Sequence, residues 1–280
     1  MKNVLLQLIV LLTTMMSCKD NTVNPSSAAV EPGTDPNFQI VANKDVGLTT
    51  FNRKVVVFDI DIYAVDGVAD VNLLHAANLL AQYLDNNEDG TVDDQKVWDA
   101  MKSNRAFLVM WKNESDLNMV LPTGREGQDL GNDETHPEWH TSKTGSFDAA
   151  LEEVLHLVTH VGYARAYPEV FGEMAGTTLT NAMDKARGGR FNSIPNTYPA
   201  GAWYTYDDQT CNYDCMATEY MYWAMTSLLG AQANRLNEIK GEWTLNTPAK
   251  LESEDPDVYA LLTDNDYKLP TVLPDGTYKR

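Results

Sequence analysis

The residues from Phe147 to Gly162 read FDAALEEVLHLVTHVG and place acidic and histidine side chains three and four positions apart. A helix over this stretch brings Glu152, Glu153, His156 and His160 to one face. Two imidazoles one turn apart are how a helix offers two nitrogen ligands to zinc. Because the chain has only five histidines, this pair favours a site for Zn²⁺, or another divalent transition metal, over ordinary packing.

A third ligand is expected from a second apolar helix, CMATEYMYWAMTSLLG, where Glu219 is the best candidate. This combination resembles the gluzincin branch of the zincin metallopeptidases over roughly residues 147–230. The resemblance implies a zinc-dependent, peptidase-like hydrolase of peptide or protein substrates, with His156, His160 and Glu219 as ligands. The chain departs from that family at Leu157, where zincins carry their catalytic glutamate.

The residue that would activate water is therefore sought one turn earlier. At about 100° per residue, Glu153 projects in nearly the direction of the missing glutamate, and Glu152 is the alternative base. Either carboxylate could instead hold an imidazole N–H of a ligand histidine. The spacing from Glu153 to His156 also occurs in di-iron bundles, but the sequence offers no second such motif.

A loop between two expected helices, 70–84 and about 94–103, reads DNNEDGTVD from position 85. Its spacing resembles an EF-hand calcium loop, with Gly90 at the sharp turn and the candidate Ca²⁺-binding residues Asp85, Asn87, Asp89, Thr91 and Asp93. Lys96 stands where that loop places its bidentate glutamate. Weak, structural calcium binding is therefore expected, with Asp93 or Asp94 as a substitute ligand; an acidic turn without an ion is the alternative.

The N-terminus predicts export. Lys2 precedes the apolar run 4–16, which is too short to span a membrane, and Ser17-Cys18 then resembles a lipobox. The resemblance implies a lipid on Cys18 and a membrane anchor, and Lys19-Asp20 is similar to the surface-export signal of outer-membrane lipoproteins in Gram-negative bacteria. An outer-membrane or cell-surface lipoprotein is expected, with an ordinary secreted protein as the alternative.

The remaining cysteines, Cys211 and Cys215, are an even pair in an oxidising compartment and predict a disulfide, with metal binding as the less favoured alternative. The formal net charge is −19 at pH 7. Because so acidic a surface repels phosphate backbones, nucleic-acid binding is excluded.

The chain divides into residues 1–17 (signal peptide), 18–45 (lipid-anchored polar linker), 46–146 (N-terminal α/β subdomain with the calcium loop) and 147–280 (metal-site helix and helical C-terminal subdomain). The expected class is α+β, with a zincin-like arrangement of the two subdomains. One strand is predicted over 54–63, with Val56 and Phe58 on its buried face, and a second over 106–111.

The segment 121–146 lacks periodicity and is expected to be a loop that rims the cleft, with His136 and His140 as second-choice ligands. Arg165, Tyr163 and Tyr167 are weaker candidates for binding a substrate oxyanion. Two functions remain: a zinc-dependent hydrolase with a structural calcium site, or a non-catalytic, calcium-stabilised binding protein of the cell surface whose zincin-like helix has lost its base.

Overall fold

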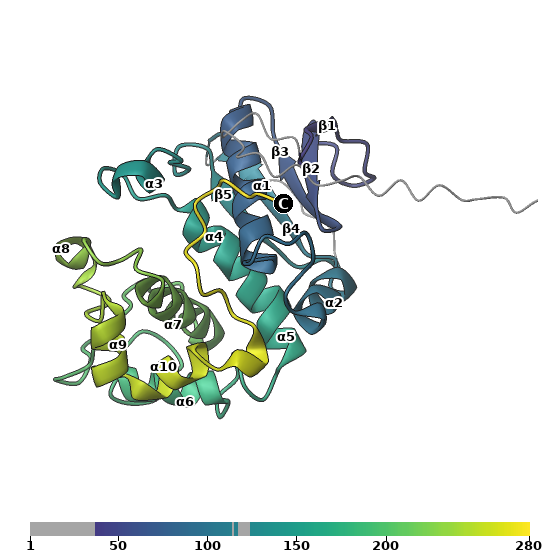
Figure 1. Ribbon diagram of the computed structural model, residues 1–280. Helices are drawn as coiled ribbons and strands as arrows, with labels where there is room; N and C mark the ends of the chain where they lie inside the picture. The colour runs from purple at the N-terminus through teal and green to yellow at the C-terminus, as the bar shows by residue number, and fades with distance from the viewer. Residues whose placement is uncertain (1–36, 114, 117–123) are drawn as a thin grey trace, which may run out of the picture.

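The computed structural model describes residues 37–113, 115–116 and 124–280. The predicted signal peptide, Cys18 and most of the predicted linker lie outside the described residues. Within them the chain is a mixed α+β protein (Figure 1). Its elements are β1 (Val41–Ala42), β2 (Arg53–Val57), β3 (Ile60–Ala64), α1 (Asp70–Leu84), α2 (Gln95–Ser103), β4 (Phe107–Trp111), β5 (Gly127–Gly131), α3 (Trp139–Ser142), α4 (Ala150–His156), η2 (Leu157–Tyr163), α5 (Ala164–Ala166), α6 (Thr178–Ala186), α7 (Tyr213–Leu228), α8 (Leu236–Ile239), α9 (Pro248–Glu254), α10 (Pro256–Leu262) and η3 (Asn265–Tyr267).

The five strands form one sheet in the order β1-β2-β3-β4-β5. Pairing is antiparallel from β1 to β3 and parallel from β3 to β5. The strand β4 is buried along its whole length, as its apolar sequence FLVMW requires at the centre of a covered sheet. The helix α1 packs against β2 and β3, and α4 packs against α1, β5 and α7.

The single strand predicted over 54–63 is wrong, because a hairpin turn divides it. Phe58 and Asp59 have φ values of 45° and 63°, as the two central residues of a tight two-residue hairpin turn require. Val57 therefore pairs with Ile60 across the turn. The buried face changes with it: Val55 and Val57 are fully buried, and Val56 is 43% exposed.

The segment 121–146 is also more ordered than predicted. The strand β5 extends the parallel part of the sheet, and α3 is a single helical turn. Hydrogen bonding to β4 thus imposes regular structure on GQDLG, a sequence that shows no strand pattern of its own. The predicted helices 70–84 and 94–103 are confirmed as α1 and α2, with Asp94 capping α2.

One continuous apolar core joins the sheet to the helical half of the chain, with buried residues contributed by β2, α1, α4 and α7. The last residues cross this junction. In Figure 1 the tail after η3 runs beside α4 and α1 and ends next to the sheet. Asn86 fixes it there, accepting hydrogen bonds from the N–H groups of Thr271 and Val272, and Tyr278 is fully buried.

Gly276 is the point at which this tail approaches α1 most closely. Its φ is +78°, and a Cβ placed on it would lie 2.1 Å from Nδ1 of His75. We predict that Gly276→Ala lowers the free energy of unfolding by about 3 kcal/mol, since a side chain there forces a buried ring aside. Gly47→Ala is the matched control, because Gly47 has a φ of +83° and no atom within 4 Å of its Cβ position. Equal effects of the two changes in urea unfolding would contradict the tight packing on His75.

Candidate metal centre

The helix α4 begins with two glutamates in its first turn, Glu152 and Glu153, where carboxylates are favoured by the helix dipole. His156 ends it. A four-residue step slightly exceeds one α-helical turn of 3.6 residues, so Glu152 and His156 lie on one face. The helix α7 packs against this helix and supplies Glu219.

Glu152, His156 and Glu219 form a group whose potential ligand atoms all lie within 4.8 Å of one another. Nε2 of His156 is 3.6 Å from Oε2 of Glu219. Both atoms are buried, and neither has a hydrogen-bond partner among the described residues. Two ligands of a tetrahedral zinc ion lie roughly 3.3–3.6 Å apart, given bonds of about 2.0–2.2 Å. The group therefore has the chemistry and the spacing of a divalent metal site.

The sequence predicts His160 as a metal ligand, but His160 lies outside this group. The chain changes from α-helix to π-helix at Leu157. In a π-helix, with i→i+5 hydrogen bonds, four residues do not complete a turn, so His160 does not stack on His156 as it would in an α-helix. Its Nδ1 instead lies 2.7 Å from a carboxylate oxygen of Glu173. Glu152 occupies the position in the group that the sequence assigned to His160.

Glu153 lies on the other side of the imidazole. Its Oε2 is 3.6 Å from Nδ1 of His156, and it also accepts a hydrogen bond from Gln128 of β5. A carboxylate that accepts the Nδ1 proton leaves the Nε2 lone pair for a metal. At 3.6 Å the pair is an ion-pair contact rather than a hydrogen bond, and Glu153 is placed on the side of the ring from which it could orient a ligand histidine.

The electrostatics of this centre are unusual for a protein interior. Burial raises the pKa of Glu152 to about 8, and it also raises the pKa of Glu219. Burial alone would lower the pKa of His156, but the neighbouring Glu219 and Glu153 carboxylates outweigh it and raise that pKa to about 10. Near pH 7 the site thus favours the protonated form of Glu152 over a second buried negative charge, and a divalent cation could take the place of the protons on these groups.

No prediction from the sequence covered two tyrosines next to these carboxylates. Tyr222 lies near Glu152 and Tyr206 near Glu219, and each hydroxyl partly offsets the rise in pKa that burial causes. The signal for Tyr222 was present, since it lies three residues after Glu219 on the same helix. Tyr206 comes from the irregular segment before α7, and no spacing rule would connect it to the site.

The disulfide between Cys211 and Cys215, expected from the cysteine count, is present in the structure with the Cα atoms 5.4 Å apart. It lies at the N-terminal end of α7, where Asn212 caps the helix by accepting a hydrogen bond from the N–H of Cys215. It therefore restrains the start of the helix that carries Glu219.

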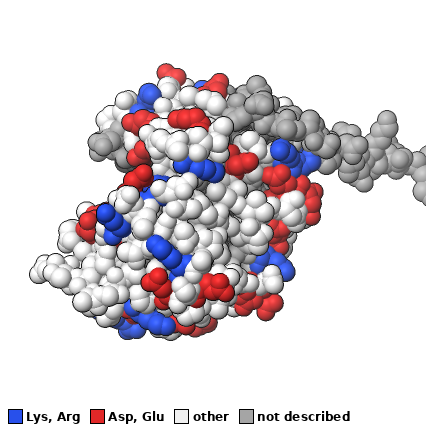
Figure 2. Space-filling view, turned by 60° about the vertical axis from the view of Figure 1, so that its left-hand side comes forward, with Lys and Arg blue, Asp and Glu red and all other residues white. Residues whose placement is uncertain are grey.

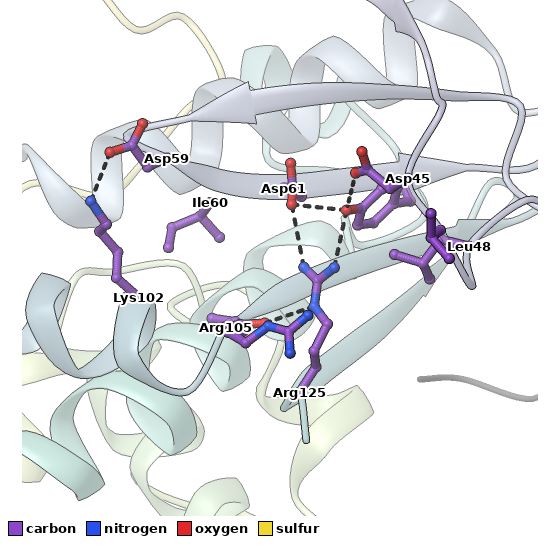
Figure 3. Close-up of a pocket in the computed structure, with 11 residues that line it drawn as sticks. Asp45, Leu48, Asp59, Ile60, Asp61, Lys102, Arg105 and Arg125 are labelled. Carbon is purple, nitrogen blue, oxygen red and sulfur yellow. Dashed lines mark hydrogen bonds and ion pairs between the residues drawn. The ribbon is translucent and has the colours of Figure 1, made fainter. Parts of the chain in front are cut away.

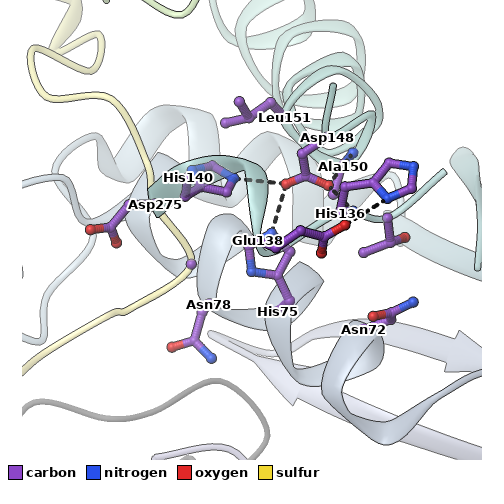
Figure 4. A network of polar contacts seen from close by, with 12 residues as sticks. Asn72, His75, Asn78, His136, Glu138, His140, Asp148, Ala150, Leu151 and Asp275 are labelled. Carbon is purple, nitrogen blue, oxygen red and sulfur yellow. Dashed lines mark hydrogen bonds and ion pairs between the residues drawn. The ribbon is translucent and has the colours of Figure 1, made fainter. Parts of the chain in front are cut away.

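A second histidine group lies between α1, α3 and the start of α4. Nε2 of His75 and Nε2 of His140 lie 2.7 and 2.8 Å from the same oxygen of Asp148, and both rings face it in Figure 4. All three side chains are buried. These are hydrogen-bond distances, shorter than the separation of two ligands of one metal ion. We therefore interpret this group as a polar cluster that ties α3 to the core.

The candidate calcium loop is tightly hydrogen-bonded. Asp85 is buried and accepts bonds from the N–H of Asp89, the N–H of Gly90 and the hydroxyl of Tyr278. Gly90 has a φ of +89°, the sharp turn that such a loop needs. Three further side chains accept bonds within the loop: Asn87 from the N–H of Asp89, Asp89 from the N–H of Thr91, and Asp93 from Asn86 and Asn87. Neither metal-type group found among the described residues includes a loop carboxylate. Asp94 is engaged as the cap of α2.

The weaker sequence candidates are engaged in local contacts. His136 lies 3.2 Å from Glu138, and Arg165 pairs with Glu126. The hydroxyls of Tyr163 and Tyr167 donate to Lys268 and Asp94 respectively. None of these side chains belongs to either metal-type group of the described residues.

A cavity of about 460 Å³ lies beside the sheet, lined by residues that include Asp59, Asp61 and Arg125. Figure 3 shows its acidic groups already paired with basic ones, among them Asp61 with Arg125 and Asp59 with Lys102. It therefore lacks the unpartnered ligand atoms of the metal centre.

On the face in Figure 2, lysines and arginines are scattered among acidic residues, so no basic surface for nucleic acid is visible there. No helix of the described residues is long and apolar enough to cross a membrane.

Comparisons of the chain with models of protein families, with curated proteins and with solved structures give no match. The interpretation of the centre therefore rests on its geometry and chemistry.

The Asp148 cluster predicts a dependence of stability on pH. Burial would raise the Asp148 pKa, but hydrogen bonds from His140 and His75 lower it well below 3.8, and burial lowers the pKa of His140. Both groups thus bind fewer protons in the folded protein, so their stabilisation is complete above about pH 6.5 and is lost as the pH falls. We expect Asp148→Asn to cost about 3 kcal/mol at pH 7 and to flatten the loss of stability below pH 4.

Urea unfolding between pH 3 and pH 7 measures both effects. Asp133→Asn is the control, because Asp133 is exposed in the same segment. An Asp148→Asn protein as stable as the parent at pH 7 would show that the cluster does not hold the segment.

Proposed function

We propose that the chain is a zinc-dependent hydrolase whose metal is held by Glu152, His156 and Glu219. The observation that supports this most is the pair of buried, unpartnered atoms, Nε2 of His156 and Oε2 of Glu219, at a separation of 3.6 Å. Three protein ligands with an open fourth position are typical of catalytic zinc sites, whereas structural sites are closed by four. When bound, the ion supplies Lewis-acid chemistry, polarising a carbonyl or lowering the pKa of a water.

The protein's own groups prepare the centre. Glu153 lies 3.6 Å from Nδ1 of His156, on the side of the ring away from Glu219, where a small movement would let it accept the Nδ1 proton. Tyr222 and Tyr206 lie near Glu152 and Glu219. A cavity of about 400 Å³ reaches Glu152 from the surface and would bring a substrate next to this ligand.

The class of substrate proposed is a peptide or protein. The reason is the likeness of the His156 helix and the Glu219 helix to those of gluzincins, which also motivates the proposed zincin-like arrangement of the two halves. The ligand set differs from the family pattern by the exchange of a histidine for Glu152. We further propose that the chain is exported as an outer-membrane or cell-surface lipoprotein through Cys18.

A non-catalytic, calcium-stabilised binding protein is the second candidate. The observation that favours it is the tight turn at Gly90. The N–H of Gly90 and the hydroxyl of Tyr278 in the C-terminal tail both donate hydrogen bonds to the carboxylate of Asp85. In the hydrolase as well, we propose that calcium at this loop has a structural role.

The ligand set is tested by the two histidines. We expect His156→Gln to lower the zinc affinity by more than about 100-fold, because loss of a ligand should cost more than loss of a residue that only supports a ligand. We expect His160→Gln to change the zinc affinity by less than about threefold. Equilibrium dialysis with elemental analysis gives both affinities. Equal losses in the two variants would support the ligand pair expected from sequence. A parent that binds no zinc, and cleaves no peptide or ester in a broad panel, would favour the calcium-stabilised binding protein.

Glu153→Gln separates orientation from proton transfer. If Glu153 orients His156, the variant binds zinc about 10–100-fold more weakly but retains most of its kcat once zinc is saturating. If Glu153 is instead the base that takes a proton from water, the variant keeps its zinc affinity and loses hydrolysis. Steady-state rates at several zinc concentrations distinguish the two outcomes.

A further inference from the structure

The cavity beside the metal centre has a definite chemical character. It is about 400 Å³ in volume, and Glu152 belongs both to its wall and to the ligand group. The rest of the wall comes from three places: the segment with Tyr206 and Asp207, Trp223 of α7, and α8 with the turn that follows it to Glu242. A molecule in this cavity would thus lie against Glu152, one of the proposed metal ligands.

The charges on the wall are unbalanced. Arg235 is already neutralised, since its Nε lies 3.0 Å from Glu238, and it also donates to Gln232. Asp207 and Glu242 have no ion pair with a lysine or arginine among the residues that the structure describes. Burial raises the pKa of Glu242, and the nearby Asp207 and Glu219 raise it further. Negative charge here would be stabilised by a cation.

Aromatic groups complete the cavity. Tyr206 and Trp223 both line it, and aromatic faces attract ammonium and guanidinium groups. Trp223 is only 7% exposed, and its indole N–H has no partner among the described residues. Because this N–H is itself buried, Trp223 offers its apolar ring, rather than the N–H, to a molecule in the cavity.

We propose that this cavity binds a lysine or arginine residue of a peptide, so that the hydrolase cleaves next to basic residues. The cation would lie between Asp207 and Glu242, with its aliphatic chain against Tyr206 and Trp223. This specificity rests on the proposed hydrolase function, but the binding itself does not, because the carboxylates and rings are present without catalysis.

Binding is tested first, on the metal-free protein. The probes are Nα-acetyl-lysine methylamide and its norleucine analogue, which has a similar aliphatic chain without the charge, followed by NMR titration. We expect the lysine probe to bind at least tenfold more tightly, with Glu242→Gln and Asp207→Asn each removing most of the difference. Glu254→Gln is the control, since Glu254 is exposed on α9. Equal affinity for the two probes would overturn the proposal.

Cleavage is tested second, with the zinc-loaded protein and a mixture of peptides of varied sequence. Preferential cleavage beside lysine and arginine, reduced at least about fivefold in kcat/KM by Glu242→Gln, would support both proposals. Cleavage without this preference would overturn the basic specificity and leave the hydrolase function intact. Selective binding of the lysine probe without any cleavage would overturn the hydrolase function and leave the cation-binding cavity.

Discussion

The repulsion between buried carboxylates is the interaction on which this account depends. Glu219 is only 9% exposed, and Glu152 and Glu153 lie close enough to raise the pKa of the intervening histidine. Without a metal, these three carboxyl groups cannot all be ionised around one imidazolium, and the pKa of Glu152 is accordingly raised to about 8. Charged groups are rarely buried unless they are paired or bind a metal. A divalent cation would allow all three groups to be ionised, which is the physical reason to expect one at this centre.

The fold brings these charges together through a change of helix type. The helix α4 supplies Glu152 and His156 with α-helical spacing, and the π-helical turn that follows sends the next residues in other directions. π-helical turns occur frequently at functional sites. Here the turn also brings Gly162 against α2, where a Cβ would lie 2.7 Å from Val97. Close packing at that glycine and the ligand geometry at His156 are thus two consequences of one local distortion.

The surrounding contacts restrain both sides of the centre. His160 and Thr218 bond the same carboxylate, Glu173, which links η2 to the residue next to Glu219. On the other side, Asp148 precedes α4 and accepts from His75 of α1. Because these groups are hydrogen-bonded to one another, movement of either helix would break one of these contacts.

The sequence alone predicted a large part of this structure. The limits of α1 follow from its apolar spacing, and the metal-type helix was located from the spacing of His156 and His160 with the glutamates before them. The hairpin at Phe58 was missed, because alternation continues through a two-residue turn while the buried face changes. His160 was misplaced, because no pattern in LVTHVGY distinguishes a π-helix from an α-helix. The Asp148 cluster joins His75 and His140, residues 65 positions apart, so only the tertiary fold reveals it.

Anomalous diffraction at the zinc edge is the most direct test of the central claim. Crystals of the protein are grown with one equivalent of Zn²⁺. They should show an anomalous peak about 2.0–2.2 Å from Nε2 of His156 and from carboxylate oxygens of Glu152 and Glu219. A map with no peak at these residues, or with its strongest peak at His75, His140 and Asp148, would contradict the account.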